Sequence, residues 1–121
     1  MNLTVNQIRF LLAVLSLTTI GEDVASKNIA RILGVTRPSV HGMLEQMIER
    51  GLIEKARYGR SRLTEEGLAV AQALETRRDK LMLLFIRRDG FPMDEALIAA
   101  TSLMSVLKEN SLLTLEAQLN P

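Results

Sequence analysis

The segment from Ala25 to Ile53 constrains the fold more than any other part of the chain, because two short helical patterns follow one another with one glycine between them. In the first pattern, apolar residues recur at helical intervals from Ile29 to Leu33. Gly34 can adopt the left-handed conformation that a tight helix exit requires. The second pattern begins near Thr36. Its apolar stripe consists of Val40, Leu44, Met47 and Ile48. Two short helices joined so tightly predict a helix-turn-helix unit.

Two residues are candidates for the N-cap of the second helix. The hydroxyl of Thr36 can accept a hydrogen bond from a free N–H of the first turn, where Pro38 is tolerated because that turn has no amide partner to lose. Arg37 is the alternative cap, with Pro38 at the first helical position, because a residue before proline avoids the helical region. The start of the helix is therefore predicted to within one residue.

A basic hairpin is expected after this helix. Gly51 is a helix stop, and Leu52 with Ile53 begins a strand. Residues 55–62 contain four cations and no acid, with Gly59 as the turn residue. A cationic hairpin that follows a helix-turn-helix predicts the wing of a winged helix-turn-helix, whose second helix can lie in a DNA major groove.

The charge distribution supports a nucleic-acid-binding surface. From Val24 to Leu63 the chain has eight Lys and Arg against three Asp and Glu, a net charge of +5. The rest of the chain has seven against eleven, a net charge of −4. Such segregated charge is typical of a protein with one face for nucleic acid.

The predicted DNA contacts divide between the second helix and the wing. Arg37 is the strongest candidate for reading bases, because a guanidinium group can pair bidentately with guanine O6 and N7. Ser39 suits a phosphate near the helix N-terminus, and Gly42 lets the backbone approach closely. Glu45 and Glu49 would repel phosphate, so only the N-terminal half of the helix is expected in the groove. The full predicted set is Lys27, Thr36, Arg37, Pro38, Ser39, His41, Gly42, Lys55, Arg57, Arg60 and Arg62.

Composition disfavours several other classes. Because there is no Cys, disulfides, zinc–thiolate sites and thiol catalysis are excluded, and the single histidine, His41, has no evident acid partner for catalysis. We therefore expect no enzyme. One Tyr, three Phe and no Trp disfavour aromatic platforms for single strands or RNA. No apolar run is long enough to span a membrane and no signal peptide is evident, so a cytoplasmic protein without a membrane partner is expected.

Helical patterns flank the winged segment. Val5 to Leu17 is expected to be a first helix, residues 18–23 a loop, and Val24 to Ser26 either a short edge strand or a direct lead into the next helix. Thr64 is a candidate cap for a long helix that ends near Arg88.

Two more amphipathic helices are expected after a break at Asp89 to Phe91, the last of them around Leu112 to Leu119. The predicted fold is mainly α. It consists of a winged helix-turn-helix DNA-binding domain at 1–66, with a small β-hairpin wing, and an all-α dimerisation domain at 67–121.

The apolar character of the last three helices predicts a homodimer, because they carry more apolar surface than a monomer of this size needs to bury. Two recognition helices would then bind a near-palindromic operator with half-sites about one helical turn (~10 bp) apart. A monomeric helical cap is the alternative. The residues predicted at the dimer contact are Leu81, Leu84, Phe85, Leu97, Ala100, Leu103, Met104 and Leu107.

In this order, the motifs resemble the diphtheria toxin repressor and manganese transport regulator (DtxR/MntR) family. The likeness covers nearly the whole chain and rests on NIARILGVTRPSVHGMLEQMIERGLIEK, RSRLTEEG, RRDKLMLLFI and DEALIAATSLMSVL. The resemblance implies that Thr36, Pro38 and Ser39 contact DNA. His41 and Gly42 replace the more usual short polar residues, which implies a different sequence preference.

The resemblance also implies a site for Mn²⁺ or Fe²⁺. The positions that match the family's ligands are Leu3, Asn6, Asp79, Leu97, Ala100 and Thr101. Only Asp79 is a usable donor, and these metals need several oxygen and imidazole ligands. Asp94 and Glu95 would join Asp79 in another register, but two acids in a first turn are more typical of partners for the helix dipole. We therefore expect no metal or other cofactor.

The sequence as a whole predicts a sequence-specific regulator of transcription, expected to be a repressor, that binds double-stranded DNA as a homodimer without the family's metal switch. One alternative is a winged-helix protein-interaction module or adaptor subunit that does not bind DNA specifically. A second alternative is a Mn- or Fe-responsive repressor with an atypical site.

Overall fold

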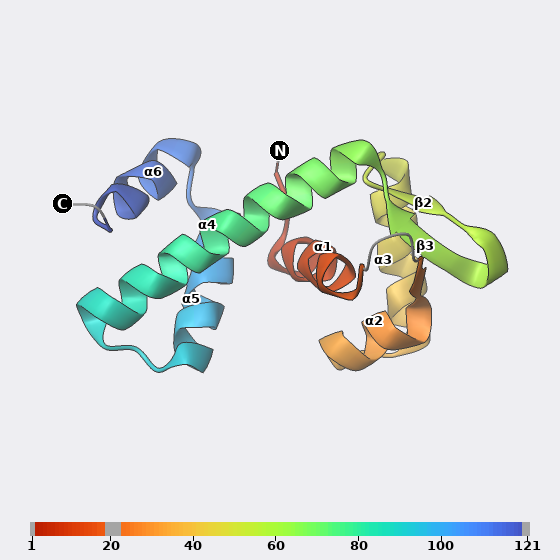
Figure 1. Ribbon diagram of the computed structural model, residues 1–121, viewed down its shortest axis with the longest axis horizontal. Coiled ribbons are helices and arrows are strands. Elements are labelled where there is room, and N and C mark those ends of the chain that lie inside the picture. Colours follow the sequence, from red (N-terminus) through yellow and green to blue (C-terminus); the bar gives the residue numbers. More distant parts are fainter. Residues whose placement is uncertain (1, 19–22, 120–121) are drawn as a thin grey trace. The chain divides into compact units, whose positions relative to one another are not determined.

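The structure is a computed structural model that describes residues 2–18 and 23–119 (Figure 1). Its described part is mainly helical, with one small sheet, which confirms the predicted fold class. The elements are α1 (Val5–Leu17), β1 (Val24–Ala25), α2 (Ser26–Leu33), α3 (Arg37–Glu49), β2 (Ile53–Lys55), a single 3-10 turn η1 (Arg57–Gly59), β3 (Arg60–Leu63), α4 (Glu65–Asp89), α5 (Met93–Val106) and α6 (Glu109–Ala117).

The chain divides into two compact units. The first, residues 9–72, contains α2, α3 and the sheet, and is called the headpiece below. The second combines residues 1–8 with 73–121 and is called the helical unit. The N-terminal residues join the helical unit partly through Ser105, whose hydroxyl donates to the Leu3 carbonyl at 3.1 Å. The functional domains assigned from the sequence, 1–66 and 67–121, stay a prediction.

The headpiece sheet is antiparallel, with strand order β1-β3-β2. Val24 pairs with Ser61 and Ile53 with Leu63, so β3 lies in the centre and β1 at an edge. Of the two expectations for Val24 to Ser26, the edge strand is confirmed, and Ser26 begins α2. The loop expected at 18–23 falls mostly on residues 19–22, which lie outside the described residues.

The headpiece core is built from the apolar faces of its helices and strands. The predicted stripe of α3 is confirmed at Val40, Leu44 and Met47, which are buried, whereas Ile48 is half-buried. The other large, fully buried side chains of this unit are Phe10, Leu11, Val14, Ile29, Leu52 and Ile53. Removal of these aliphatic and aromatic surfaces from water is the main force that holds the small sheet against the helices.

The turn of the helix-turn-helix depends on Gly34. This residue has φ 68° and ψ 35°, and its N–H donates to the Ala30 carbonyl. Thr36 is the N-cap of α3, since its Oγ1 accepts from the Ser39 N–H at 3.3 Å. The alternative with Arg37 as the cap is wrong. Arg37 is the first helical residue, because the hydrogen bond of the Thr36 cap outweighs the preference of a residue before proline for extended backbone.

A close backbone contact joins the sheet to the start of α4. Thr64 Oγ1 accepts from the Gly67 N–H at 2.9 Å and donates to the Gly51 carbonyl at 2.7 Å, which confirms Thr64 as the predicted cap. A Cβ atom on Gly67 would lie 1.8 Å from the Leu52 carbonyl oxygen. Only glycine fits there, so the beginning of α4 is locked to the residue before β2.

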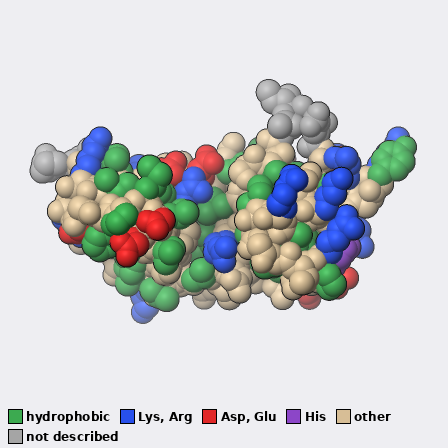
Figure 2. Space-filling view, turned by 90° about the horizontal axis from the view of Figure 1, so that it is seen from below, with side chains coloured by type: hydrophobic (Ala, Val, Ile, Leu, Met, Phe, Trp, Pro, Cys, Tyr) green, Lys and Arg blue, Asp and Glu red, His purple; other side chains and the backbone are tan. Residues whose placement is uncertain are grey.

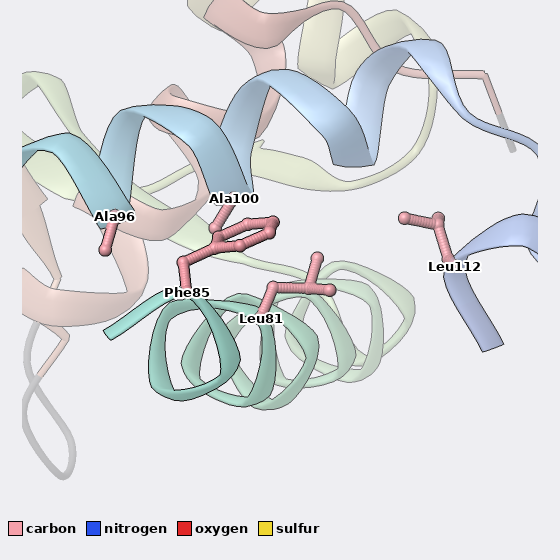
Figure 3. Close-up of a cluster of buried hydrophobic side chains, with 5 residues drawn as sticks. All are labelled: Leu81, Phe85, Ala96, Ala100 and Leu112. Carbon is pink, nitrogen blue, oxygen red and sulfur yellow. The ribbon is translucent and has the colours of Figure 1, made fainter. Parts of the chain in front are cut away.

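The helical unit has its own core, shown in Figure 3. Leu81 and Phe85 on α4 are buried with Ala96 and Ala100 on α5 and with Leu112 on α6. The alanines leave room for the larger side chains of α4.

This core corrects part of the predicted dimer contact. Leu81, Phe85 and Ala100 are buried within the single chain, as is Leu84, so they cannot form an exposed surface for a partner. The sequence could not distinguish the two roles, because an apolar helix face looks the same whether another helix of the chain or a second chain covers it.

An ion-pair cluster ties α4 to α6. The Arg77 guanidinium makes two hydrogen bonds with the Glu109 carboxylate, at 2.7 and 2.8 Å, and another with Glu116 at 3.0 Å. These bonds raise the pKa of Arg77 above its ordinary value. They also lower the pKa of Glu109 below its ordinary value. Bidentate pairing of this kind fixes geometry as well as charge.

Candidate nucleic-acid interface

The N-terminal half of α3 is exposed, as a recognition helix requires. Its exposed residues are Thr36, Arg37, Pro38, Ser39, His41 and Gly42. The hydroxyls of Thr36 and Ser39 lie 3.0 Å apart and take part in the cap, so their first role is to hold the helix start. Within the described chain, Arg37 has no charged partner.

Gly42 lies on this surface without a structural need for glycine. A Cβ atom built on it would meet nothing within 4 Å. Because glycine destabilises the interior of a helix relative to alanine, the chain gains no stability from glycine at this exposed position.

The wing has the predicted form, a hairpin of β2 and β3 joined by the turn η1 (Figure 1). Its four cations, Lys55, Arg57, Arg60 and Arg62, are all exposed. Lys55 and Arg57 have no acidic partner among the residues that the structure describes, and the same holds for Lys27 near the start of α2.

The other two wing cations are partly engaged by a residue that sequence reasoning missed. Arg62 Nε lies 3.2 Å from the Asp23 carboxylate and 3.9 Å from that of Glu54. Arg60 Nη1 donates to the Asp23 carbonyl at 3.1 Å. Asp23 precedes β1 and reaches the wing through the β1–β3 pairing. The free cations of the wing are therefore Lys55 and Arg57 rather than all four.

The recognition helix and the wing border one cavity. It has a volume of about 290 Å³, and its lining includes His41 and Glu45 from α3 together with Lys55 and Arg60 from the wing. Ser26 also lines it, and its Oγ is buried without a hydrogen-bond partner among the described residues. Figure 2 shows Lys and Arg side chains gathered around the single histidine. One residue of the predicted reading helix, His41, thus lies on the same side of the headpiece as two predicted phosphate-binding residues of the wing, Lys55 and Arg60.

Three of the positions that match metal ligands, Asp79, Ala100 and Thr101, are used for packing or local pairing. Ala100 is buried, and Thr101 Oγ1 donates to the carbonyls of Leu97 and Ile98 at 2.9 and 3.2 Å. Asp79 pairs with its neighbour Arg78 at 3.0 Å. Within residues 2–18 and 23–119, no three His, Cys, Asp or Glu side chains lie together as a metal site. The expected lack of a metal stays a prediction.

The remaining predicted dimer residues lie partly at the surface. Leu97 is exposed, and Leu103, Met104 and Leu107 are half-buried against the core of the helical unit. Sequence reasoning missed three more exposed apolar side chains of α5, which are Met93, Ile98 and Val106. None of the described helices is long and apolar enough to cross a membrane.

Comparison with known proteins identifies the class of this chain. A model of the MarR family matches residues 1–62, which include the helix-turn-helix and nearly the whole wing. The chain therefore belongs to the MarR family, a family of winged helix-turn-helix regulators. No curated protein sequence matches it significantly.

Solved structures share the fold over nearly the full chain. A hypothetical protein from Sulfolobus solfataricus is 19% identical to this chain, with a TM-score of 0.73. The match covers 98% of this chain and 90% of that protein. IdeR from T. acidophilum is 21% identical, with a TM-score of 0.72, and the match covers 100% of this chain and 56% of that one.

Two further matches are the manganese regulator SloR and ScaR with bound Zn²⁺. SloR has 21% identity and a TM-score of 0.82, and the match covers 94% of this chain and 53% of SloR. ScaR has 20% identity and a TM-score of 0.73, with 95% of this chain and 54% of ScaR covered. The chain thus spans about half the length of IdeR, SloR and ScaR. At these identities the matches establish the fold, which agrees with the resemblance seen in the sequence, whereas the family shown by sequence is MarR.

Proposed function

We propose that this protein is a transcriptional regulator that binds double-stranded DNA in a sequence-specific manner, as a homodimeric repressor without enzymatic activity. The observation that carries the proposal is the shared side of the headpiece. There His41 of α3 lines one cavity with Lys55 and Arg60 of the wing. Arg37, Lys55 and Arg57 are exposed and free of acidic partners in the described chain. Free, exposed cations supply the sequence-independent phosphate affinity that DNA-binding proteins need.

The roles within this surface follow from chemistry. Arg37 reads a base and Pro38 contacts a thymine methyl in the major groove, because they stand at the start of the helix. His41 lies one turn further along the same helix. Lys27, Lys55 and Arg57 bind phosphates, and Arg60 and Arg62 contribute less because Asp23 already engages both.

Selection of binding sites from random duplexes, followed by affinity measurement at several salt concentrations, tests the proposal. The logarithm of the binding constant should fall with that of the salt concentration by about 0.9 per neutralised phosphate. Arg37→Ala should cost about 1–3 kcal/mol on the selected site and flatten the base preference.

The wing provides a matched pair of variants for the same measurement. Arg57→Ala should weaken binding to all sequences equally and reduce the salt slope by about one phosphate. Arg62→Ala should have a smaller effect, because Asp23 already neutralises that cation. Weak binding without sequence preference would contradict the proposal and favour a protein-interaction module or adaptor.

Independence from metal is part of the proposal. SloR is a manganese regulator and the ScaR structure holds bound Zn²⁺, but half of the residues at the matching positions here are aliphatic and only Asp79 is a usable donor for such metals. Addition of Mn²⁺ or Fe²⁺ to the metal-free protein should leave operator affinity unchanged. A large increase on addition of either metal would instead support an atypical metal-responsive repressor.

A further inference from the structure

The tip of the wing has an unusual backbone conformation. Tyr58 lies in the left-handed region, with φ 61° and ψ 36°, and is followed by Gly59 with φ 71°. The Arg60 N–H donates to the Arg57 carbonyl, and the Ala56 N–H donates to the Arg60 carbonyl at 2.9 Å. Two consecutive left-handed residues closed in this way form the pattern of a type I′ hairpin turn.

Tyrosine is poorly suited to this turn. The first central position of a type I′ turn favours Asn, Asp or Gly, whose side chains tolerate positive φ. Tyr58 is the only non-glycine residue with positive φ among the described residues. Asparagine would fit the backbone better, so the fold of the hairpin does not explain the tyrosine.

Packing does not explain it either. Tyr58 is 93% exposed and has no hydrogen bond or ring contact with another described residue. Strain without internal compensation is typical of functional positions. The hairpin therefore presents an aromatic ring whose only possible contacts lie outside the chain.

The charges around the ring indicate the kind of partner. Arg57 and Arg60 flank Tyr58 in sequence, and the hairpin shares its cavity with α3. With α3 in the major groove, a projecting wing reaches the neighbouring backbone and minor groove. A narrow minor groove has an enhanced negative potential that attracts arginine. An acidic nucleic acid suits this tip better than a neutral protein surface.

We infer that Tyr58 is a specificity-determining residue that enters the DNA minor groove beside each half-site, where its ring packs on deoxyribose. The inference rests on the proposed function, because it requires the recognition helix to be in the adjacent major groove. Insertion of the ring is easiest where the minor groove can open, so Tyr58 makes binding depend on flanking base pairs that α3 does not touch.

Tyr58→Asn separates folding from binding, because it should raise the stability of the fold and lower the affinity for DNA. The variant should melt about 3 °C higher, because asparagine relieves the turn, and should bind the selected duplex about fivefold more weakly. Tyr58→Phe is the matched control, which keeps the ring and should bind more tightly than the asparagine variant. Equal binding by the wild type and Tyr58→Asn would overturn the inference, as would equal loss in both variants.

Footprinting locates the contact on the DNA. Hydroxyl radicals attack deoxyribose from the minor groove, so the wild type should protect sugars that flank each half-site. Tyr58→Asn should lose that protection and keep the protection of guanine N7 in the major groove. Unchanged sugar protection in the variant would overturn the inference.

Intrinsic fluorescence gives a direct readout, because the chain has one Tyr and no Trp. Quenching by acrylamide, measured from lifetimes, should be efficient in the free protein and fall several-fold on the saturated duplex. If Tyr58 stays accessible to acrylamide while the protein is bound to DNA, this inference alone is overturned, and the wing tip would instead contact a protein partner. A wild type that binds no duplex would overturn both the inference and the proposed function.

Discussion

The headpiece and the helical unit differ in which of their cations are paired with acids. In the helical unit, Arg77 pairs with Glu109 and Glu116, and Arg78 and Arg88 pair with adjacent aspartates. In the headpiece, Arg37, Lys55 and Arg57 have no acidic partner within the described residues. The pairs made by Arg77 join α4 to α6, whereas unpaired charges repel one another and stabilise nothing within the chain.

The two units also differ in what they leave exposed. The headpiece exposes backbone at Gly42, cations on the wing and scattered apolar side chains such as Ile32, whereas the helical unit exposes several apolar side chains on the one helix α5. Ile98 is 64% and Val106 71% exposed. Under the proposed function, the headpiece meets DNA, a charged and hydrated partner, and the apolar side chains of α5 meet a second chain.

The largest expected effect tests whether the headpiece is as tightly packed as its core indicates. Gly67→Ala should destabilise the protein by about 3 kcal/mol, because the new methyl group collides with the Leu52 carbonyl. Urea unfolding followed by circular dichroism measures it. Gly42→Ala is the matched control, since it makes the same change in a helix with open space around it. Equal stability of the two variants would refute the locked junction.

The next effect tests the ion-pair cluster of the helical unit. Arg77→Met should cost about 2 kcal/mol of unfolding free energy, because it leaves the half-buried carboxylate of Glu116 without its partner. Arg78→Met is the control and should cost less than about 0.5 kcal/mol, since Arg78 pairs with the next residue and joins no two helices. Similar losses in both variants would mean that the cluster does not tie α6 to α4.

Gly42→Ala sharpens the contrast between folding and binding within the headpiece. The substitution should stabilise the protein by about 1 kcal/mol, because alanine is the better helix former and meets nothing within 4 Å. It should also weaken binding to the selected duplex, because the methyl group faces the groove. Unchanged affinity would remove Gly42 from the interface, whatever the change in stability.

The smallest expected effect is a pH dependence of stability that comes from the Arg77–Glu109 pair of the helical unit. Arg77 lowers the pKa of Glu109 in the folded state below the ordinary 4.5. The stabilisation that the Glu109 carboxylate gains from Arg77 is therefore complete above about pH 4.5, and it is lost as the pH falls through the lower folded-state pKa of Glu109. Melting temperatures of the wild type and Glu109→Gln should differ at neutral pH and converge in acid. A difference that persists at low pH would contradict this assignment.

Local chemistry made much of this fold predictable. The bounds of α1, the left-handed Gly34, the caps at Thr36 and Thr64 and the wing depend on interactions within a few residues. Such interactions leave a direct pattern in the sequence, because hydrogen-bond partners and apolar spacing stand within one or two helical turns.

Contacts between distant residues were not predictable in this way. Asp23 meets Arg60 and Arg62 only because β1 pairs with β3, and the sequence has no signal for that pairing at a distance of 37 residues. For the same reason, apolar periodicity assigned Leu81, Phe85 and Ala100 to a dimer contact, although α4, α5 and α6 bury them within one chain.

The sequence by itself determined the winged helix-turn-helix, the position of its cationic hairpin and the helical character of the C-terminal half, since periodicity, caps and turn residues act locally. The tertiary structure alone decided which cations stay free and which apolar residues stay exposed. It also decided that Tyr58, at the wing tip, has a left-handed backbone and an exposed side chain. These properties depend on the side chains that pack around each residue, and solvent exposure and long-range pairing exist only once the chain has folded.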